Sequence, residues 1–495
     1  MRARVSWGVV AGLLGCLGAC NALLGIDEAD VRPGPGAAGQ GGAPGAAGGG
    51  AAGAGGRGGA GGASGAGGGA SGAGGRAGPS LDASFGDQGV ATTDLGGTSA
   101  KALSVVTLQP LPSGAVAVAG HYDFFTPEAF DQGDAFVARL DAAGRLDPTF
   151  ASDLGGQEGF QSGQGAVLID RTVSSDTVLG AHVDEAQSSV VVRTYHADTS
   201  EGTSITRLWH AELRAAGSVL SPFGSGGDSD VLSTYVFPSS FGGRLYRAVT
   251  PGYFLQRLSI IDVDPTQPLP SPPPPTPQVA LPDVAFPKIP IFAAAAGGFV
   301  YVVANDDTTA SRVGFVRLIE WPDGLALDTQ LADGTGFATV DFAPLGFAIS
   351  GPPFGVALDR ATRDFYVGLS AAEGGAPRPV AVKFKADGGL DESFGTLGVL
   401  DAFAEGDPAW ACLAIDAAGG LVVAGVSGGQ PRARRFSAQG AADPSFGPDG
   451  VALPFAPQRC ALDAVGRLLL AGPAAGEGGK VSLALARLHL GGAAP

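Results

Sequence analysis

The sequence contains few residues that could perform metal or acid–base chemistry, and they are widely spaced. Its five histidines form no His-x-x-x-His or His-Glu-x-x-His pattern, the spacings that place two zinc ligands on one face of a helix. A metal site would need histidines from separate parts of the fold to converge, and His182 and His196 are the best placed for that. We predict no metal site and no cofactor. The histidines are His121, His182, His196, His210 and His489.

Motifs for nucleophilic or phosphate chemistry are also missing from the sequence of the folded region. It has no Gly-x-Ser-x-Gly elbow, and Gly478-Gly479-Lys480-Val481 lacks the Ser or Thr that follows the lysine of a phosphate loop. Acidic pairs such as Asp228 and Asp230 do not extend into a calcium loop, so we interpret them as solvated turns. We predict no catalytic residue.

Two cysteines, Cys412 and Cys460, precede similar phrases, Ala414-Ile415-Asp416 and Ala461-Leu462-Asp463. Disulfides persist in exported proteins, so one interpretation is a bond between neighbouring structural units. The other is a pair of buried free thiols that pack as small apolar residues.

The N-terminus has the pattern of an export signal. Arg2 and Arg4 precede an apolar run over residues 9–14, and the segment ends in Leu17-Gly18-Ala19-Cys20. That ending resembles the bacterial lipobox, which implies that the Cys20 sulfur carries a diacylglycerol. We predict a lipoprotein signal peptide over residues 1–19 and a lipid anchor on Cys20.

Two alternatives remain for this segment. Cys16 ends a second, poorer lipobox-like sequence, and an ordinary secretory signal would leave both cysteines unmodified. After Cys20 comes Asn21 rather than the Asp that marks retention in the inner membrane, so we expect the outer membrane.

Residues 20–80 are predicted to be a flexible tether. From residue 33 onward they are almost wholly Gly and Ala, which cannot bury enough apolar surface to offset the entropy of ordering. A flexible Gly-rich chain of the length of residues 33–80 has an average end-to-end distance of roughly 40 Å.

A short phrase recurs along the rest of the chain and indicates a repeat protein. Leu81-Asp82-Ala83-Ser84-Phe85-Gly86 returns at residues 146–150, 390–395 and 442–447, with degenerate copies near Leu220, Leu281 and Leu327. The seven units lie near residues 81–145, 146–219, 220–280, 281–326, 327–389, 390–441 and 442–491. A repeated unit must stack on its copies to bury its apolar faces.

Each unit contains short alternating apolar runs divided by Gly, Asp or Pro, the pattern of β-strands. The first unit has runs at residues 90–95, 102–108, 115–121 and 135–141. We therefore predict an all-β fold over residues 81–491: a seven-bladed β-propeller with antiparallel blades of three to four strands. Phe85, Phe394 and Phe446 are expected to be buried between units, because their local surroundings are small and turn-forming.

The phrase, followed by strands such as Gly420–Gly425 and Ala484–Leu488, resembles the delta-60 repeat of bacterial secreted and surface proteins. The resemblance is strong over residues 81–150 and 380–490 and weak over 151–326. It implies a propeller-like fold outside the cytoplasm and no particular catalytic residue.

The formal net charge of −17 argues against nucleic acid and anionic lipid headgroups as partners. We expect a monomer that meets the membrane only through its N-terminal lipid. The leading hypothesis is a non-enzymatic module that binds envelope protein or polysaccharide, because sequence individuality is concentrated in the second to fourth units. The alternative is a lyase or hydrolase of extracellular polymer with its site at the propeller channel.

Overall fold

A computed structural model describes residues 78–491 with gaps at several connections, and between residues 151 and 310 it describes little besides the strands. The predicted signal peptide, Cys20 and nearly all of the predicted tether lie outside the described residues. No helix in the described part of the chain could cross a membrane.

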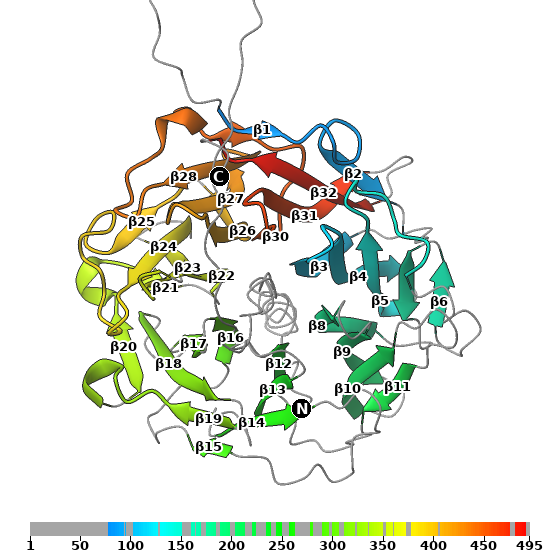
Figure 1. The fold of residues 1–495 in the computed structure, drawn as a ribbon, viewed down its shortest axis with the longest axis horizontal. Helices are drawn as coiled ribbons and strands as arrows, with labels where there is room; N and C mark the ends of the chain where they lie inside the picture. The colour runs from blue at the N-terminus through cyan, green and yellow to red at the C-terminus, as the bar shows by residue number, and fades with distance from the viewer. Residues whose placement is uncertain are drawn as a thin grey trace, which may run out of the picture.

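The fold is all-β, as predicted, and its sheets are antiparallel. The described strands form seven sheets, which stand around a ring in chain order (Figure 1). Helical structure in the described part is limited to the single 3-10 turns Ala332–Gly334, Ala343–Leu345 and Pro444–Phe446.

The first three sheets take their strands consecutively from the chain. Sheet 1 contains β3 (Ala102–Pro110), β4 (Val116–Thr126), β5 (Ala129–Leu140), β6 (Phe160–Gly163) and β7 (Ala166–Ile169). Sheet 2 contains β8 (Ser175–Asp184), β9 (Ser189–Asp198), β10 (Thr203–Glu212) and β11 (Leu220–Phe223). Sheet 3 contains β12 (Thr234–Pro238), β13 (Arg244–Val249), β14 (Arg257–Asp262) and β15 (Gln278–Ala280).

The next three sheets follow the same plan. Sheet 4 contains β16 (Pro290–Ala296), β17 (Phe299–Asn305), β18 (Arg312–Trp321), β19 (Gly324–Leu327) and β20 (Phe337–Asp341). Sheet 5 contains β21 (Ala348–Ile349), β22 (Gly355–Leu358), β23 (Phe365–Ala372), β24 (Arg378–Phe384) and β25 (Val399–Asp401). Sheet 6 contains β26 (Gly406–Ile415), β27 (Leu421–Ser427), β28 (Gln430–Phe436) and β29 (Val451–Ala452).

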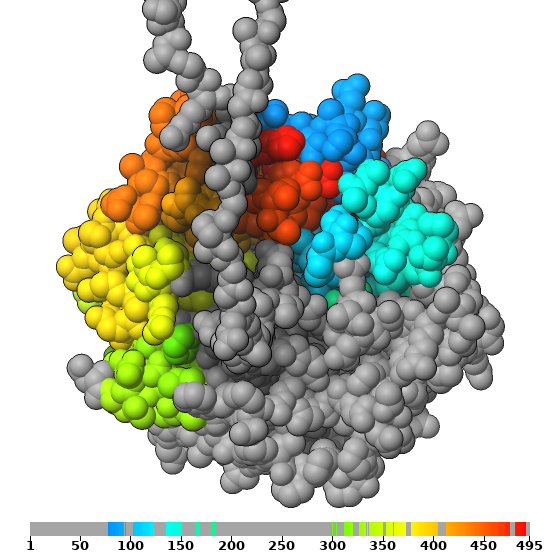
Figure 2. All heavy atoms as spheres, viewed as in Figure 1, coloured from blue at the N-terminus to red at the C-terminus, as the bar shows by residue number. Residues whose placement is uncertain are grey.

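The last sheet, here called the closing sheet, joins both ends of the described chain. Its strands β30 (Arg459–Leu462), β31 (Leu468–Ala475) and β32 (Val481–His489) are completed by β1 (Ser80–Leu81) and β2 (Val90–Thr93), which both pair with β32. In Figure 2 the blue N-terminal residues therefore lie beside the red C-terminal ones. The ring is closed by hydrogen bonds between strands.

Two details differ from the sequence prediction. Four of the seven described sheets have five strands rather than three or four. In the closing sheet and sheet 4 the reason is that the phrase turn divides the outer position into two short strands, β1 with β2 and β19 with β20. The middle strands also lack alternation: β27 is buried at five consecutive residues, because neighbouring sheets cover both of its faces.

The sheets are offset from the sequence units. The strand that follows a phrase pairs with a strand that precedes it: β7 with β5, β20 with β18, β25 with β24 and β29 with β28. Each phrase therefore lies inside a sheet, between its third strand and its outer strand.

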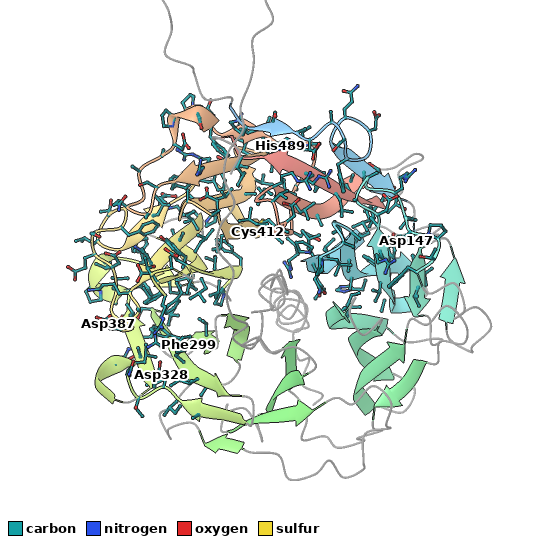
Figure 3. The ribbon with its side chains drawn as sticks, viewed as in Figure 1. Asp147, Phe299, Asp328, Asp387, Cys412 and His489 are labelled. Atoms are coloured by element: carbon teal, nitrogen blue, oxygen red, sulfur yellow. A yellow bond between two sulfur atoms is a disulfide. The ribbon has the colours of Figure 1, made fainter. Side chains whose placement is uncertain are left out.

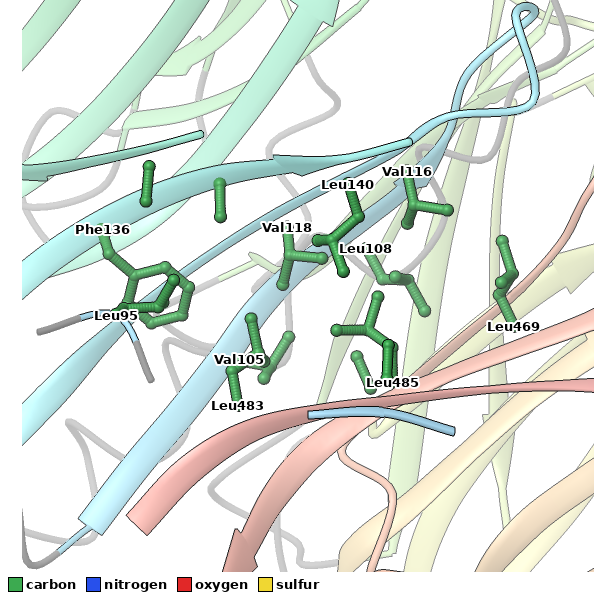
Figure 4. Close-up of a cluster of buried hydrophobic side chains, with 14 of the residues drawn as sticks. Leu95, Val105, Leu108, Val116, Val118, Phe136, Leu140, Leu469, Leu483 and Leu485 are labelled. Carbon is green, nitrogen blue, oxygen red and sulfur yellow. The ribbon is translucent and has the colours of Figure 1, made fainter. Parts of the chain in front are cut away.

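The hydrophobic core consists of separate layers between consecutive sheets. Figure 4 shows the layer in which Leu108 and Val116 of sheet 1 face Leu469 and Leu485 of the closing sheet. Equivalent layers lie between sheets 4 and 5, between sheets 5 and 6, and between sheet 6 and the closing sheet. Each sheet is thus stabilised mainly by its two neighbours.

Candidate functional site: the joints between sheets

Most of the well-buried ion pairs of the described residues involve a phrase aspartate, so we build the candidate site at the phrases. In the five phrases that the structure describes at side-chain level, the aspartate closes a tight turn, because one carboxylate oxygen accepts the backbone N–H two residues later. The N···O distances are 3.0 Å for Ser84 to Asp82, 2.9 Å for Thr149 to Asp147, 2.9 Å for Gln330 to Asp328, 3.2 Å for Ser393 to Asp391 and 2.9 Å for Ser445 to Asp443. This is the Asx-turn chemistry that makes Asp effective at such positions.

The second carboxylate oxygen of each phrase aspartate pairs with a basic residue on the third strand of the same sheet. The pairs are Arg487–Asp82 at 2.8 Å, Arg317–Asp328 at 2.6 Å, Lys383–Asp391 at 2.8 Å, Arg435–Asp443 at 3.2 Å and Arg139–Asp147. The backbone N–H of each aspartate also donates to the carbonyl of that same basic residue. The backbone bond and the ion pair together fix the position of the phrase against the third strand.

At three sheets the basic residue also reaches the following sheet. Its side chain donates to a carbonyl in the turn that follows the third strand there: Arg487 to Ala142 at 3.0 Å, Lys383 to Ala438 at 3.4 Å, and Arg317 to Ala386. A backbone bond lies beside each of these contacts: Gly86 to Ala143 at 2.7 Å, Gly395 to Gln439 at 3.0 Å and Ala332 to Asp387 at 3.0 Å. Figure 3 labels Asp328 and Asp387 at the last of them. We call this set of contacts between one phrase and the next turn a joint.

The apolar residue at the fifth position of the phrase fills the space inside the joint. Phe85 and Phe394 have no exposed surface and Phe446 is 3 % exposed, and each packs among side chains of two consecutive sheets. The expectation that these three rings are buried between units is confirmed. Phe150 and Leu331 occupy the same position in sheets 1 and 4.

Glycine in the turn is required by close approach. A Cβ atom on Gly440 would lie 2.7 Å from the backbone nitrogen of Gly395, and Gly440 also has a φ of +83°. Gly144 stands in the same relation to Gly86, at 3.0 Å. The turn can therefore rest directly on the preceding phrase.

The electrostatics of the joints favour ionised carboxylates. Burial alone would raise the pKa of Asp82, but hydrogen bonds from Ser84 and the charge of Arg487 outweigh it and hold that pKa well below its usual value. The same balance lowers the pKa of Asp147, Asp391 and Asp443. Burial would lower the pKa of Lys383, but Asp391 and Asp364 raise it. These groups keep fixed charges near neutral pH, which suits them to holding a structure rather than to transferring protons.

We expect the protein to lose stability in acid through these aspartates. Their folded-state pKa values lie below the unfolded value near 4, so their contribution is complete well above that pH, begins to fall near it and is lost as the pH falls through the folded-state values. Urea denaturation between pH 6 and pH 3 should show a falling free energy of unfolding below about pH 4. Asp391→Asn should unfold more easily at pH 6 and have a flatter profile below pH 4. A variant with an unchanged profile would contradict the assignment.

His182 and His196, the pair that the sequence favoured for a metal site, are not brought together. Strand register pairs His182 with Val191 and His196 with Asp176, so the two lie six residues apart along β8 and β9. That is roughly 20 Å of extended strand. Within the described residues no group of three or more His, Cys, Asp or Glu side chains could hold a metal ion. Burial, with a smaller effect from the charge of Arg459, lowers the pKa of His121 to about 4, so this histidine is neutral at pH 7.

Cys412 and Cys460 are buried and form a disulfide in the structure, with their Cα atoms 5.8 Å apart. Cys412, labelled in Figure 3, lies on β26 of sheet 6. Cys460 lies on β30 of the closing sheet. The bond therefore joins two neighbouring sheets.

Sequence reasoning identified the phrase aspartates and phenylalanines but not the partners of the aspartates. A signal was present: Arg139, Lys383 and Arg435 each precede their aspartate by eight residues. The recurrence of a basic residue eight positions before the phrase aspartate would have indicated which residue each aspartate pairs with. The contacts with the following turns have no comparable signal, because the residues involved are up to 345 positions apart.

Comparison with known proteins assigns no family. No family model matches the chain, and no curated protein matches it. Several solved structures show a limited similarity. They include the β-propeller domain of the Trilobed protease from Pyrococcus furiosus, with 8 % identity, a TM-score of 0.38, and coverage of 76 % of this chain and 90 % of that one.

Two further structures belong to enzymes. The periplasmic gluconolactonase of Pseudomonas aeruginosa has 16 % identity and a TM-score of 0.40 over 70 % of this chain and 83 % of that one. An acylaminoacyl peptidase has 10 % identity and a TM-score of 0.40 over 78 % of this chain and 52 % of its own, so the chain spans about half the length of that peptidase. Similarity at this level transfers no activity to this chain.

Proposed function

We propose that the protein is a lipid-anchored, seven-bladed β-propeller of the bacterial outer membrane that binds envelope protein or polysaccharide without catalysing a reaction. The arrangement of seven described sheets around a ring and the closure of the ring by β1 and β2 support the propeller. The predicted signal, tether and lipid anchor support a location at the cell envelope, and we propose that the protein is a monomer there.

The observation that carries the binding role is where the repeated residues lie. In an antiparallel sheet the connections alternate between the two ends of the strands. The phrases therefore lie at the same end as the hairpins between the first and second strands. Arg467 in one such hairpin and Asp416 in another join the phrase networks, with Arg467–Asp82 at 2.9 Å and Arg435–Asp416 at 2.6 Å. The repeated charges at these ends of the strands are therefore used in fixing the phrases and hairpins of each sheet.

The connections between second and third strands belong to the opposite end of the strands. They range from two residues at 127–128 and 428–429 to seven at 250–256. Their variety of length and sequence is what a recognition surface requires, since loops on a rigid scaffold can change without disturbing it. We assign ligand binding to the face of the ring that carries the connections between second and third strands.

A direct test uses peptidoglycan sacculi and surface polysaccharide isolated from the same cells. A lipid-free Cys20→Ser protein should sediment with one of these polymers, or be captured with an envelope protein by cross-linking, and should release no soluble saccharide. Release of unsaturated or reducing saccharides would instead establish the alternative, a lyase or hydrolase acting at the channel. Replacing residues 250–256 by a short Gly-Ser loop should weaken binding, whereas the exposed phrase-edge variant Arg145→Ala should bind like the parent.

The anchor makes a separate prediction. If Cys20 carries the lipid, Cys20→Ser should move the protein from the membrane fraction to the soluble fraction, because no other anchor is proposed. Mass spectrometry of the mature N-terminus should show a diacylglyceryl cysteine at position 20. Cys16→Ser is the matched control and should leave the protein in the membrane fraction. An unmodified mature N-terminus elsewhere would contradict the prediction.

A further inference from the structure

The joints depend on a turn that the closing sheet cannot form. At the joints described above, the acceptor carbonyls belong to the turn that connects a third strand to its own phrase, as Ala143 does between Leu140 and Leu146. In the closing sheet, β32 and the phrase beginning at Leu81 pair as Leu488 with Leu81 and His489 with Ser80, but they come from distant parts of the chain. No covalent turn joins them.

The joint between sheet 6 and the closing sheet shows the consequence. Gly447 occupies the position of Gly86 and Gly395, but its N–H donates to Pro444 within its own turn at 3.0 Å. Arg435 occupies the position of Arg487 and Lys383, and its ion pairs are with Asp416 and Asp443 of its own sheet. The donors that reach the following sheet at the three joints described above are thus used within sheet 6 here.

The segment before β1 lies in the place of the missing turn. Counted back from the phrase leucine, Gly78 corresponds to Ala143. A Cβ atom on Gly78 would be 3.4 Å from the carbonyl oxygen of Ser445, in the phrase of sheet 6. The chain entering the closing sheet therefore passes close to the phrase of sheet 6.

The disulfide joins the same two sheets, but on their first strands rather than at the phrase. Cys412 and Cys460 belong to sheet 6 and the closing sheet, and both lie in the apolar layer that also contains Phe446. We propose that this disulfide supplies, between sheet 6 and the closing sheet, the connection that a turn supplies elsewhere, so that oxidation of the two thiols reinforces the ring that β1 and β2 close. The two thiols lose two protons and two electrons to a disulfide-bearing thiol oxidase of the exported compartment, which becomes a dithiol.

This role differs from the general stabilisation that any disulfide provides by restricting the unfolded chain. A general effect would be the same whichever way the chain is connected. A local role in closure would depend on whether the missing turn is present. The two can be separated by supplying that turn.

The experiment compares two chain orders by amide hydrogen exchange. The first is the full protein, oxidised and then reduced with a phosphine in the folded state, with Cys412→Ala/Cys460→Ala alongside. The second is a permuted chain in which a copy of residues 141–145 joins Leu488 to Leu81 and the new ends lie within the 250–256 connection. In the native order, loss of the disulfide should speed exchange in β30, β1 and β2 at least tenfold, while β4 and β5 remain protected. In the permuted chain the same change should be less than threefold.

Equal acceleration in both chain orders would overturn the proposal, as would free thiols in the purified exported protein. Should the double cysteine variant fail to fold, reduction of the folded protein decides the question. Exchange that rises evenly over all sheets would also count against a local role.

Discussion

Replacing Phe394 by alanine should lower the free energy of unfolding by about 3–5 kcal/mol, the usual cost of truncating a fully buried phenylalanine. The ring has no exposed surface, and it packs edge-on against Tyr366 with ring centroids 5.3 Å apart. It also contacts the layer formed by Leu413, Leu421 and Phe436 of the next sheet. The cavity would therefore open between two sheets, where neither sheet can collapse alone.

Chemical denaturation followed by far-ultraviolet circular dichroism would measure this loss. Leu397→Ala is the matched control: it removes a large apolar side chain three residues later in the same segment, but that side chain is 55 % exposed. Its effect should stay within about 0.5 kcal/mol. Removing residues before Gly78 should also change little. A Phe394→Ala protein that unfolds like the parent would show that the phrase is not the contact between sheets.

Arg317→Ala should destabilise the protein by a similar amount, about 3–5 kcal/mol, because it leaves a buried carboxylate without its cation. The Arg317 and Asp328 side chains are 5 % and 2 % exposed, and their atoms lie 2.6 Å apart. Arg317 also donates to Ala386 of sheet 5, so the substitution removes part of a joint as well.

A double-mutant cycle separates the ion pair from the lost packing. The loss of unfolding free energy in the Arg317→Ala/Asp328→Ala double variant should be smaller than the sum of the two single losses. The difference should be at least about 2 kcal/mol. The Arg145–Asp141 pair provides the control, since Arg145 is 78 % exposed and its contact of 2.7 Å is open to water. Its coupling should stay below about 0.5 kcal/mol. Coupling of equal size in the two cycles would mean that burial does not set the strength of the joints.

The parts of the fold that the sequence predicted are those determined by local chemistry. The phrase was recognisable because Asp82 and Ser84 form their turn within three residues, and the strands because apolar runs end at Gly and Asp. The burial of Phe85 followed from the absence of any local partner for a large ring. These inferences need no knowledge of distant residues.

The joints could not be predicted in the same way. Arg487 and Asp82 are 405 positions apart, and whether they meet depends on how the ring closes. The alternation expected for every strand was wrong for middle strands such as β27, because the sequence does not reveal that a sheet is covered on both faces. Cys412 and Cys460 were recognised as candidates, but only the arrangement of β26 and β30 brings their sulfur atoms together.

The offset between sequence unit and sheet has a consequence for how such a gene can change. A unit that runs from one phrase to the next carries the outer strand of one sheet and the first three strands of the following sheet. Tandem duplication of that unit would insert a whole sheet together with the contacts to both neighbours, because every new boundary falls inside a sheet that is already hydrogen-bonded. Divergence of one copy would then leave the ring intact.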